Sequence, residues 1–552
     1  MKKLVLIVAA ALALTAVATT GSSKKDITKN LEVFNALVKE LQTYYVDTID
    51  IEKSVTTAIS AMLDDIDPYT EYISYKDQED FKTVTSGEYA GIGSYIMERN
   101  GWVYFSEPQA GSPAHTAGIK AGDKIVMIDN DSTRGWESAR VSKTLKGQAG
   151  TKVKVTVHRP YVADSVLTFE LTRAKIIQPS VPYSGIVGDG IGYIELTSFT
   201  ERSPEEVKTA LTALKEENPG LRGLIFDLRA NGGGLLESAC KIAGYFLPRG
   251  TEVLKTRGKG VLNERTYKTT ERPIDTEIPI VILIDGGTAS ASEIVSGALQ
   301  DVDRAVIMGA RSFGKGLVQS SRELPYDGLL KVTVAKYYIP SGRLIQAIDY
   351  SHRNPDGSVS RIPDSLTNVF YTAGGREVRD GGGITPDVAL EYPEVSHLAY
   401  SVVRDNWVFD YATRYAAEHS TIVPADKFVV DDTLWADFKA SIDPARFKYD
   451  KVWDEMFESI RKVVEREGYM NDSVAAEFTR LEDMLRHDLN SDLDLNRKVI
   501  APYLSGEIVQ RYYDQRGRRA DAVKYDMFID SAVSLLNDAA RYKAILAPVK
   551  KR

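Results

Sequence analysis

The spacing of apolar residues changes along the chain and divides it into regions of different character. Residues 27–63 have a helical pattern, because apolar side chains recur there at intervals of three and four and share one helical face. They are Leu31, Phe34, Leu37, Val38, Leu41 and Tyr45, then Val55, Ile59, Met62 and Leu63. Asp67-Pro68 breaks the pattern. We predict an N-terminal helical region over residues 27–75.

Residues 86–175 have the pattern of a small mixed β domain. Val153, Val155 and Val157 alternate with polar residues, as in a half-buried strand. A short helix is predicted over residues 138–145, and turn-forming glycines separate the other apolar runs.

Residues 176–392 alternate apolar strand patterns with helical patterns. The runs 224–228 and 278–284 each lead into a turn with neighbouring glycines and then into a helix. Such repeated units predict an α/β layer, in which functional sites tend to lie where strands pass into helices. We assign residues 76–85 and 176–392 to one core.

Residues 395–552 are mostly helical and show no pattern that carries chemistry. We expect packing there, or contacts to a second copy or an adaptor. One apolar stripe precedes the helix-ending Gly468: Val452, Trp453, Met456, Phe457, Ile460, Val463 and Val464. The predicted fold class is therefore multidomain α+β, with N-terminal helices, a small β domain, an α/β core and a C-terminal helical domain.

The first twenty residues have the pattern of a targeting sequence. Lys2 and Lys3 precede an apolar run from Leu4 to Ala18 and a series of small residues. This arrangement is typical of a secretory signal, and the run is short for a membrane span. We predict a signal peptide at 1–20 and export to a bacterial periplasm or cell envelope, with an uncleaved anchor as the alternative.

Composition excludes several classes of protein. At 43% hydrophobic and 26% charged residues, the 552-residue chain is neither wholly disordered nor fibrous. A net charge of -8 without a basic block argues against nucleic-acid binding. Cys240 is the single cysteine, so an intrachain disulfide and a cysteine-rich zinc site are excluded. The six histidines form no close metal-type pair, and we predict neither metal nor cofactor.

Ser290 begins a helical pattern directly after a buried strand. A serine at such a turn can present its hydroxyl near the positive end of a helix, where backbone N–H groups can stabilise an oxyanion. However, Ser290 and Glu293 also form a capping-box pattern. The local sequence therefore fits both a nucleophile and a simple helix cap.

A nucleophilic serine needs a base, and Lys315 is a candidate between Gly314 and Gly316. A lysine acts as a base only when neutral, so burial must lower its pKa far below about 10.4. A solvated turn is the alternative. A phosphate loop is a third interpretation, but Gly316 stands where a Ser or Thr should hold magnesium.

The triple glycine Gly232-Gly233-Gly234 follows Asn231. Glycines let backbone amides approach a ligand closely and face an anion. An oxyanion hole, a phosphate site and a tight turn all fit this sequence.

Taken together, these elements resemble the C-terminal processing peptidases, or tail-specific proteases. The resemblance covers about residues 27–392, with a PDZ domain around Gly91-Ile92-Gly93 and a protease core of the crotonase/ClpP-like type. It rests on three motifs in the same order: Asp227-Leu228-Arg229-x-Asn231-Gly232-Gly233-Gly234, Thr288-Ala289-Ser290-Ala291-Ser292-Glu293-Ile294 and Phe313-Gly314-Lys315-Gly316-x-Val318-Gln319. The segment Gly381-Gly382-Gly383-Ile384-Thr385-Pro386-Asp387 resembles the one that closes the protease core.

The resemblance implies a role for individual residues. Ser290, rather than Ser292, would be the nucleophile, Lys315 the general base and Gln319 the residue that orients the lysine. The oxyanion hole would combine the amide of Ala291 with one from Gly232, Gly233 or Gly234. Asp301 would be structural, and Thr288 stands where a serine is often found.

These roles imply an exported serine endopeptidase that selects proteins by exposed, apolar C-terminal tails. Gly91, Ile92 and Gly93 would bind the tail's carboxylate while an edge strand pairs with its backbone; the PDZ domain could instead gate the protease or only pack against it. A non-catalytic tail-binding scaffold and a different hydrolase on a related α/β core are the alternatives.

Overall fold

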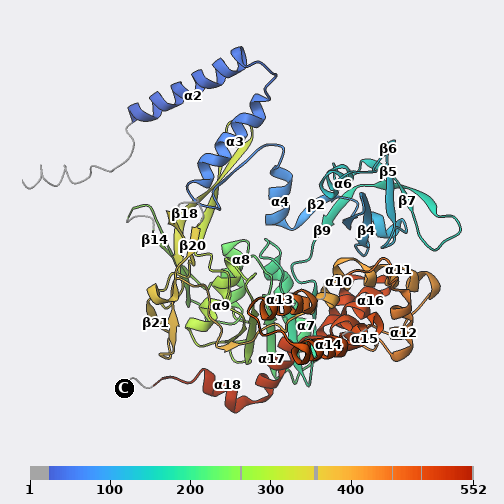
Figure 1. Cartoon of the computed structure of the whole chain (residues 1–552). Coiled ribbons are helices and arrows are strands. Elements are labelled where there is room, and N and C mark those ends of the chain that lie inside the picture. The colour runs from blue at the N-terminus through green and yellow to red at the C-terminus, as the bar shows by residue number, and fades with distance from the viewer. Residues whose placement is uncertain (1–23, 261–263, 354–358, 450–451, 486–487, 550–552) are drawn as a thin grey trace, which may run out of the picture. The chain divides into compact units, whose positions relative to one another are not determined.

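The structure is a computed structural model, and its described residues form two compact units (Figure 1). One unit ends at Ser74 and also holds Ser321–Thr333, and the other holds Tyr75–Ser320 and the chain from Val334 onward. The predicted signal at 1–20 lies outside the described residues, which are 24–260, 264–353, 359–449, 452–485 and 488–549.

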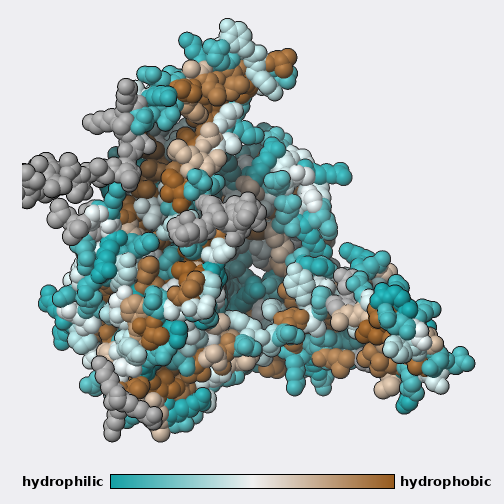
Figure 2. Space-filling view, turned by 60° about the vertical axis from the view of Figure 1, so that its left-hand side comes forward, coloured by the Kyte–Doolittle hydropathy of each residue, from teal (hydrophilic) through white to brown (hydrophobic). Residues whose placement is uncertain are grey.

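The first unit contains the predicted N-terminal helices, α2 (Lys24–Tyr44) and α3 (Ile51–Asp64). Strand β1 (Glu71–Ile73) pairs antiparallel with the first part of β18 (Gly328–Tyr338). Apolar side chains on α2 are exposed, with Leu31 at 63% and Leu37 at 52%, and Figure 2 shows apolar side chains at the surface in brown. The periodicity predicted the helices but not the exposure of this apolar face.

In the second unit, the predicted β domain follows helix α4 (Gln78–Ser86). Its main sheet has the order β3-β4-β5-β7-β8, so β3 is an edge strand. Val153, Val155 and Val157 are buried on β7, as their alternation predicts. The elements are β2 (Glu88–Gly91), β3 (Ser94–Arg99), β4 (Trp102–Pro108), α5 (Pro113–Thr116), β5 (Lys124–Ile128), β6 (Asp131–Ser132), α6 (Ser138–Leu145), β7 (Lys152–His158), β8 (Val166–Thr172) and β9 (Ala174–Ile177).

The core of the second unit is a six-stranded sheet in the order β10-β11-β12-β15-β16-β23. All neighbouring strands from β11 to β23 run parallel, and β10 is antiparallel to β11. This is the predicted α/β layer. Its strands are β10 (Tyr183–Val187), β11 (Ile191–Glu195), β12 (Gly223–Asp227), β15 (Ile280–Ile284), β16 (Val306–Gly309) and β23 (Val388–Ala389).

Helices cover both faces of this sheet. On one face, Phe226 and Ile282 belong to the buried cluster formed with α7 (Ser203–Glu217), α8 (Leu236–Gly244) and α9 (Ala291–Asp301). On the other face, Ile225 and Val281 pack with α17 (Met527–Asn537) and α18 (Ala539–Ile545). Alternate residues of each strand therefore face different layers, and the last helices of the chain complete the core, which the sequence did not reveal.

The remaining strands form smaller sheets. Strand β13 (Glu252–Gly258) pairs with β14 (Glu264–Lys268) and with the last residues of β18, and β17 (Leu317–Leu324) pairs with β18. Two further pairs are β19 (Ile348–Arg353) with β20 (Val359–Arg361) and β21 (Val369–Tyr371) with β22 (Glu377–Arg379); η2 (Asp364–Leu366) lies between these pairs.

The region after residue 395 is mostly helical, as predicted. None of the helices in the described part of the chain is long and apolar enough to cross a membrane. The helices are α10 (His397–Arg404), α11 (Trp407–Glu418), α12 (Asp432–Ser441), α13 (Val452–Arg466), α14 (Asp472–Leu485), α15 (Leu489–Leu495) and α16 (Arg497–Ala522), followed by η3 (Val523–Tyr525), α17 and α18.

Candidate active site

Three loops singled out from the sequence follow three neighbouring strands of the core sheet. The glycine-rich loop follows β12, the Ser290 turn follows β15, and the Lys315 loop follows β16. Because these strands are parallel, their carboxyl ends lie at one edge of the sheet, which is where α/β proteins place their sites. The topology therefore brings the candidate residues to the same edge.

Ser290 occupies the N-terminus of α9 in a conformation that a helix cap does not normally have. Its backbone angles are φ 56° and ψ −114°, whereas an N-cap residue usually lies in the β region. A positive φ in a residue with a Cβ is strained. The N–H of Ser290 donates to Glu293 Oε2 at 2.8 Å. The carboxylate of Glu293 therefore makes the hydrogen bond that the capping-box pattern predicts.

The glycine-rich loop packs directly against this turn. A Cβ on Gly233 would lie 2.7 Å from Ala289 O, 2.8 Å from Ser290 Cβ and 2.9 Å from the nitrogen of Ala291. Asn231 O accepts the N–H of Ala289 at 3.0 Å and thereby joins the two segments. Only a glycine permits this approach.

The candidate oxyanion donors differ in their present bonding. Asn231 Oδ1 accepts the N–H of Gly233 at 2.9 Å, so this donor is already engaged. A Cβ on Gly232 would meet no atom within 4 Å, so open space adjoins that residue. Gly234 instead lies against the backbone of Phe199. Among the three glycines, Gly232 is therefore the best candidate to face a ligand together with Ala291.

A buried carboxylate joins the Ser290 turn to the Lys315 loop. Glu293 is fully buried. Besides the N–H of Ser290, it accepts the N–H of Lys315 at 2.9 Å and of Gly314 at 2.7 Å, and the hydroxyl of Ser312 at 2.5 Å. Burial raises the pKa of Glu293, while these hydrogen bonds oppose the increase. The sequence contained a signal for Glu293, but the pattern indicated only a cap.

Tyr337 is a second link between these segments, and no pattern in the sequence indicated its role. Its hydroxyl lies 2.8 Å from Lys315 O and 3.2 Å from Ser290 O, and donates to these carbonyls. Burial raises the pKa of Tyr337 well above its ordinary value. The hydroxyl therefore stays protonated and available as a donor.

The other predicted residues have clear positions. Lys315 is half-buried, and Gln319 is half-buried in β17 at an even spacing from it; even spacing places residues on one face of an extended chain. Asp301 ends α9, is buried and pairs with Arg343 at 2.9 Å, which suits the structural role expected for it. Ser292 is also buried, and its hydroxyl donates to Asn231 O.

The β domain has a groove at the predicted peptide-binding loop. Gly91, Ile92 and Gly93 line it, together with the edge strand β3 and residues Ser142, Leu145 and Lys146 at the end of α6. Its volume is about 240 Å³. The carbonyls of Ile92 and Gly93 accept internal hydrogen bonds, which hold the loop in place.

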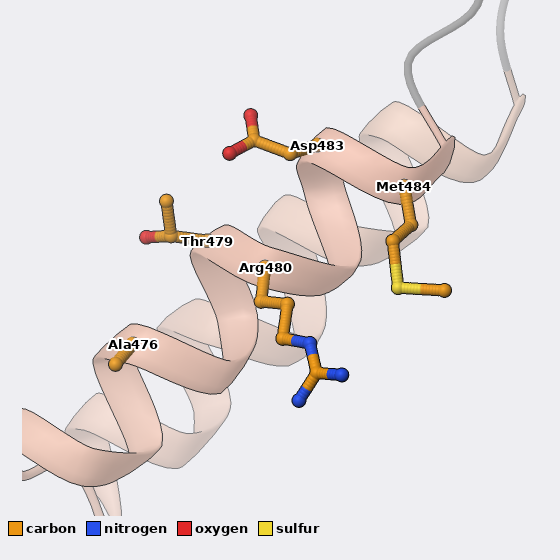
Figure 3. A pocket seen from close by; sticks show the side chains of 5 residues that line it. All are labelled: Ala476, Thr479, Arg480, Asp483 and Met484. Carbon is orange, nitrogen blue, oxygen red and sulfur yellow. The ribbon is translucent and has the colours of Figure 1, made fainter.

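A second pocket lies along α14 (Figure 3). The five residues that line it, Ala476, Thr479, Arg480, Asp483 and Met484, come from one helix. None of the residues singled out from the sequence belongs to it, so it is not a candidate for the catalytic site.

Comparison with known proteins places these features in a family. Residues 190–356 match Peptidase family S41, residues 81–158 match the PDZ domain, and residues 398–536 match the family described as "Probable PDZ-protease, C-terminal helical domain". The third match covers a region for which the sequence motifs gave no family.

Named relatives agree with these matches. The chain is 35% identical over 373 residues to a carboxy-terminal-processing protease of Bartonella bacilliformis, covering 67% of this chain and 84% of the relative. It is 32% identical over 329 residues to carboxy-terminal processing protease CtpA of Bacillus subtilis, covering 59% and 68%. The solved photosystem II D1 C-terminal processing protease is 27% identical, with 65% and 92% covered and a TM-score of 0.36.

These findings favour an active protease over the tail-binding scaffold that the sequence left open. The identity to the first relative, together with the share of that relative that is covered, is sufficient to assign the family. The chain belongs to the carboxy-terminal processing proteases of peptidase family S41, which are serine-type peptidases.

Proposed function

We propose that the protein is an exported endopeptidase in which Ser290 is the nucleophile and Lys315 the general base. The observation that carries the proposal is the carboxylate of Glu293, which accepts the N–H of Ser290 and the N–H of Lys315. One buried side chain thus fixes the backbones of both residues. Such fixed geometry is what proton transfer between a nucleophile and its base requires.

The proposed reaction is an acyl transfer in two stages. Neutral Lys315 Nζ takes the proton of the Ser290 hydroxyl as Oγ bonds to the peptide carbonyl carbon. The resulting oxyanion is stabilised by the amides of Ala291 and Gly232. Lys315 then returns the proton to the leaving amine as the C–N bond breaks, and water hydrolyses the acyl-enzyme.

The PDZ groove supplies the selection of substrates. An extended tail would add to the open edge of β3, and the amides around Gly91–Gly93 would bind its terminal carboxylate. Ile96 and Leu145 line the groove beside them and favour an apolar last residue, next to polar side chains such as Ser142 and Gln178. A peptide with a free apolar C-terminus should therefore bind, and the same peptide with an amidated C-terminus should bind much more weakly.

The proposal is tested by Ser290→Ala and Lys315→Ala in the full chain, with an unfolded protein as substrate. Both variants should stay folded and lose cleavage by at least about 1,000-fold, as when a member of a catalytic unit is removed. Labelling by a serine-directed fluorophosphonate should disappear in Ser290→Ala. Substantial activity in either variant would contradict the assignment.

Two further measurements separate the alternatives. Fluorophosphonate labelling of Ser292 in Ser290→Ala would show that the nucleophile was wrongly chosen, although the buried hydroxyl of Ser292 makes this unexpected. Cleavage should also rise toward alkaline pH, because Lys315 must be neutral. A profile that is flat from about pH 6 to 9 would argue against a lysine base that titrates in this window.

A further inference from the structure

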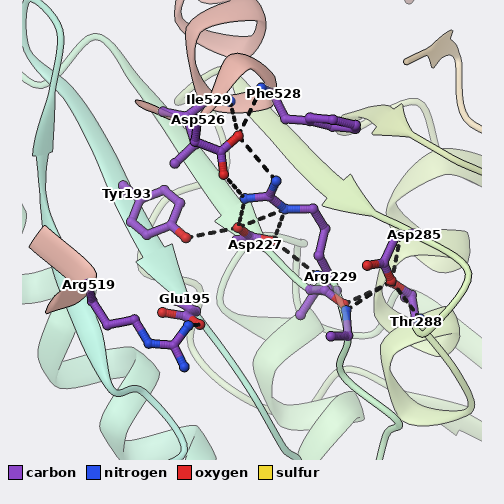
Figure 4. Close-up of polar contacts among 12 residues, drawn as sticks. Tyr193, Glu195, Asp227, Arg229, Asp285, Thr288, Arg519, Asp526, Phe528 and Ile529 are labelled. Carbon is purple, nitrogen blue, oxygen red and sulfur yellow. Dashed lines mark hydrogen bonds and ion pairs between the residues drawn. The ribbon is translucent and has the colours of Figure 1, made fainter. Parts of the chain in front are cut away.

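The glycine-rich loop begins with an arginine that is held from two sides (Figure 4). Arg229 Nη2 lies 2.6 Å from Asp227 Oδ2 and 2.7 Å from Asp526 Oδ2. A second bond joins Arg229 Nη1 to Asp526 Oδ1 at 3.2 Å. Asp227 ends strand β12, whereas Asp526 directly precedes α17, almost three hundred residues later in the chain. The loop is thus bound to the last helices of the protein.

Both carboxylates are themselves fixed. Asp526 Oδ1 accepts the N–H groups of Phe528 at 2.9 Å and Ile529 at 3.2 Å, as the N-cap of α17. Asp227 Oδ2 accepts the hydroxyl of Tyr193 at 2.8 Å. The two carboxylates therefore present a rigid, preformed site for the planar guanidinium of Arg229, which favours this bidentate geometry.

The arginine is only 14% exposed, so its charge is poorly solvated. Burial alone would lower the pKa of Arg229, but the charges and hydrogen bonds of Asp227 and Asp526 raise it. Contacts to charged groups in such surroundings stabilise more than exposed ion pairs do. The anchor is therefore strong enough to constrain the backbone that follows it.

That backbone is strained. Ala230 has φ 54°, a conformation that is unfavourable for an L-residue with a Cβ. Its N–H donates to Asp285 Oδ1 at 2.9 Å, while Arg229 is held from the other side. Three residues later Gly233 contacts the Ser290 turn. Strained segments persist where the surroundings over-determine them, and Arg229 is one of these determinants.

We propose that Asp526 is a positioning residue for catalysis: through Arg229 it holds the glycine-rich loop in the conformation that places Gly233 against the Ser290 turn. The docking of α17 on the sheet then controls the oxyanion hole. This inference rests on the proposed function, since the loop is taken to supply an oxyanion donor.

The test is Asp526→Asn in the full chain, because asparagine keeps the helix cap and removes the charge that Arg229 binds. We expect kcat to fall about tenfold to a hundredfold with little change in KM, because a displaced oxyanion donor acts mainly on the transition state. Hydrogen exchange at residues 230–235 should become faster. In a double-mutant cycle, Asp526→Asn should have little further effect on kcat when Arg229→Gln is already present.

Two matched variants separate positioning from general stability. Asp538→Asn changes an exposed aspartate that caps α18 through the N–H of Arg541. Arg414→Gln breaks an ion pair between two other C-terminal helices, α11 and α12, to Asp437 at 2.6 Å. Both should keep the wild-type kcat and the wild-type exchange of the loop.

The outcomes are distinct. Wild-type kcat and loop exchange in Asp526→Asn would overturn the proposal, and so would equal losses in Arg414→Gln. Faster loop exchange in Asp526→Asn, in a chain whose wild type cleaves nothing, would support the positioning contact and refute the proposed function instead.

Discussion

Two serines at helix N-termini, Ser290 before α9 and Ser396 before α10, show how different the same sequence feature can be. Ser396 has φ −63° and ψ 150°, and its hydroxyl accepts the N–H of Ala399 at 3.1 Å. It is an ordinary cap. Ser290 has φ 56° and ψ −114°. The difference lies in the backbone, which the type of residue at the cap does not reveal.

The surroundings explain why Ser290 keeps this conformation. Gly233 packs against it on one side, and the buried Glu293 holds its N–H on the other. Ser396 lacks this arrangement: the third residue of α10 is Ala399, and the hydroxyl of Ser396 donates to Asn496 Oδ1. A strained conformation that its neighbours over-determine is typical of functional sites, and here it coexists with the capping box of Ser290 and Glu293.

The largest effect in this comparison should come from Gly233→Ala. The added Cβ would lie within 3 Å of three atoms of the Ser290 turn, and φ +100° is unfavourable for alanine. We expect kcat/KM for protein cleavage to fall at least about 100-fold, as for a small misplacement of catalytic groups. Circular dichroism should report a folded protein.

Gly286→Ala is the matched control, because a Cβ at this neighbouring turn would meet no atom within 4 Å. The kcat/KM of Gly286→Ala for protein cleavage should stay within a few-fold of the wild-type value. If Gly233→Ala cleaves as fast as Gly286→Ala, the close packing of the glycine-rich loop on the Ser290 turn is not required for activity.

A smaller effect, on stability, should have opposite signs at the two serines. Ser290→Gly relieves strain of about 1–2 kcal/mol but gives the unfolded chain more freedom, which costs roughly 0.4–1 kcal/mol, so the free energy of unfolding should rise by at most about 1 kcal/mol. Ser396→Ala removes a cap and should lower it by about 1 kcal/mol, with activity unchanged. Urea denaturation of both variants measures this. A loss of stability in Ser290→Gly would mean that the Ser290 hydroxyl acts as a cap.

Much of the fold was predictable because burial imposes periodicity. The runs 224–228 and 278–284 became β12 and β15, and the short helix at 138–145 became α6. The strand–loop–helix order also predicted that functional loops lie where strands pass into helices, which is where the three loops are found. The resemblance supplied the roles of Ser290 and Lys315, which local sequence left open.

The features of the fold and the site that the sequence did not predict depend on contacts between distant segments. The sequence predicted that residues 395–552 are mostly helical but not that α17 covers the core sheet, because many apolar surfaces could accept such a helix. Likewise, Asp526 carried no signal of its contact with Arg229, and Tyr337 resembled any aromatic residue of a strand. Short-range patterns report which face is apolar, whereas the partner of that face is a property of the whole chain.

The smallest effect concerns pH and again separates the two turns, because only the Ser290 turn contains a buried carboxylate. Folding raises the pKa of Glu293 above 4.5 through burial. Between 4.5 and the raised value the folded protein binds more protons than the unfolded chain, so this group makes stability fall as pH rises. Outside that window its contribution is constant. The hydrogen bonds to the carboxylate oppose the increase in its pKa and so narrow this window.

Glu293→Gln removes this titration, so the wild type should gain stability relative to the variant as the pH is lowered from 8 toward 4.5. Urea denaturation of both proteins across this range gives the difference directly, and Ser396→Ala, which alters the α10 turn without removing a carboxylate, should show no such trend. A difference that grows with rising pH would mean that the hydrogen bonds from Ser290, Lys315 and their neighbours outweigh burial, and that Glu293 is held as a stabilised anion beneath the site.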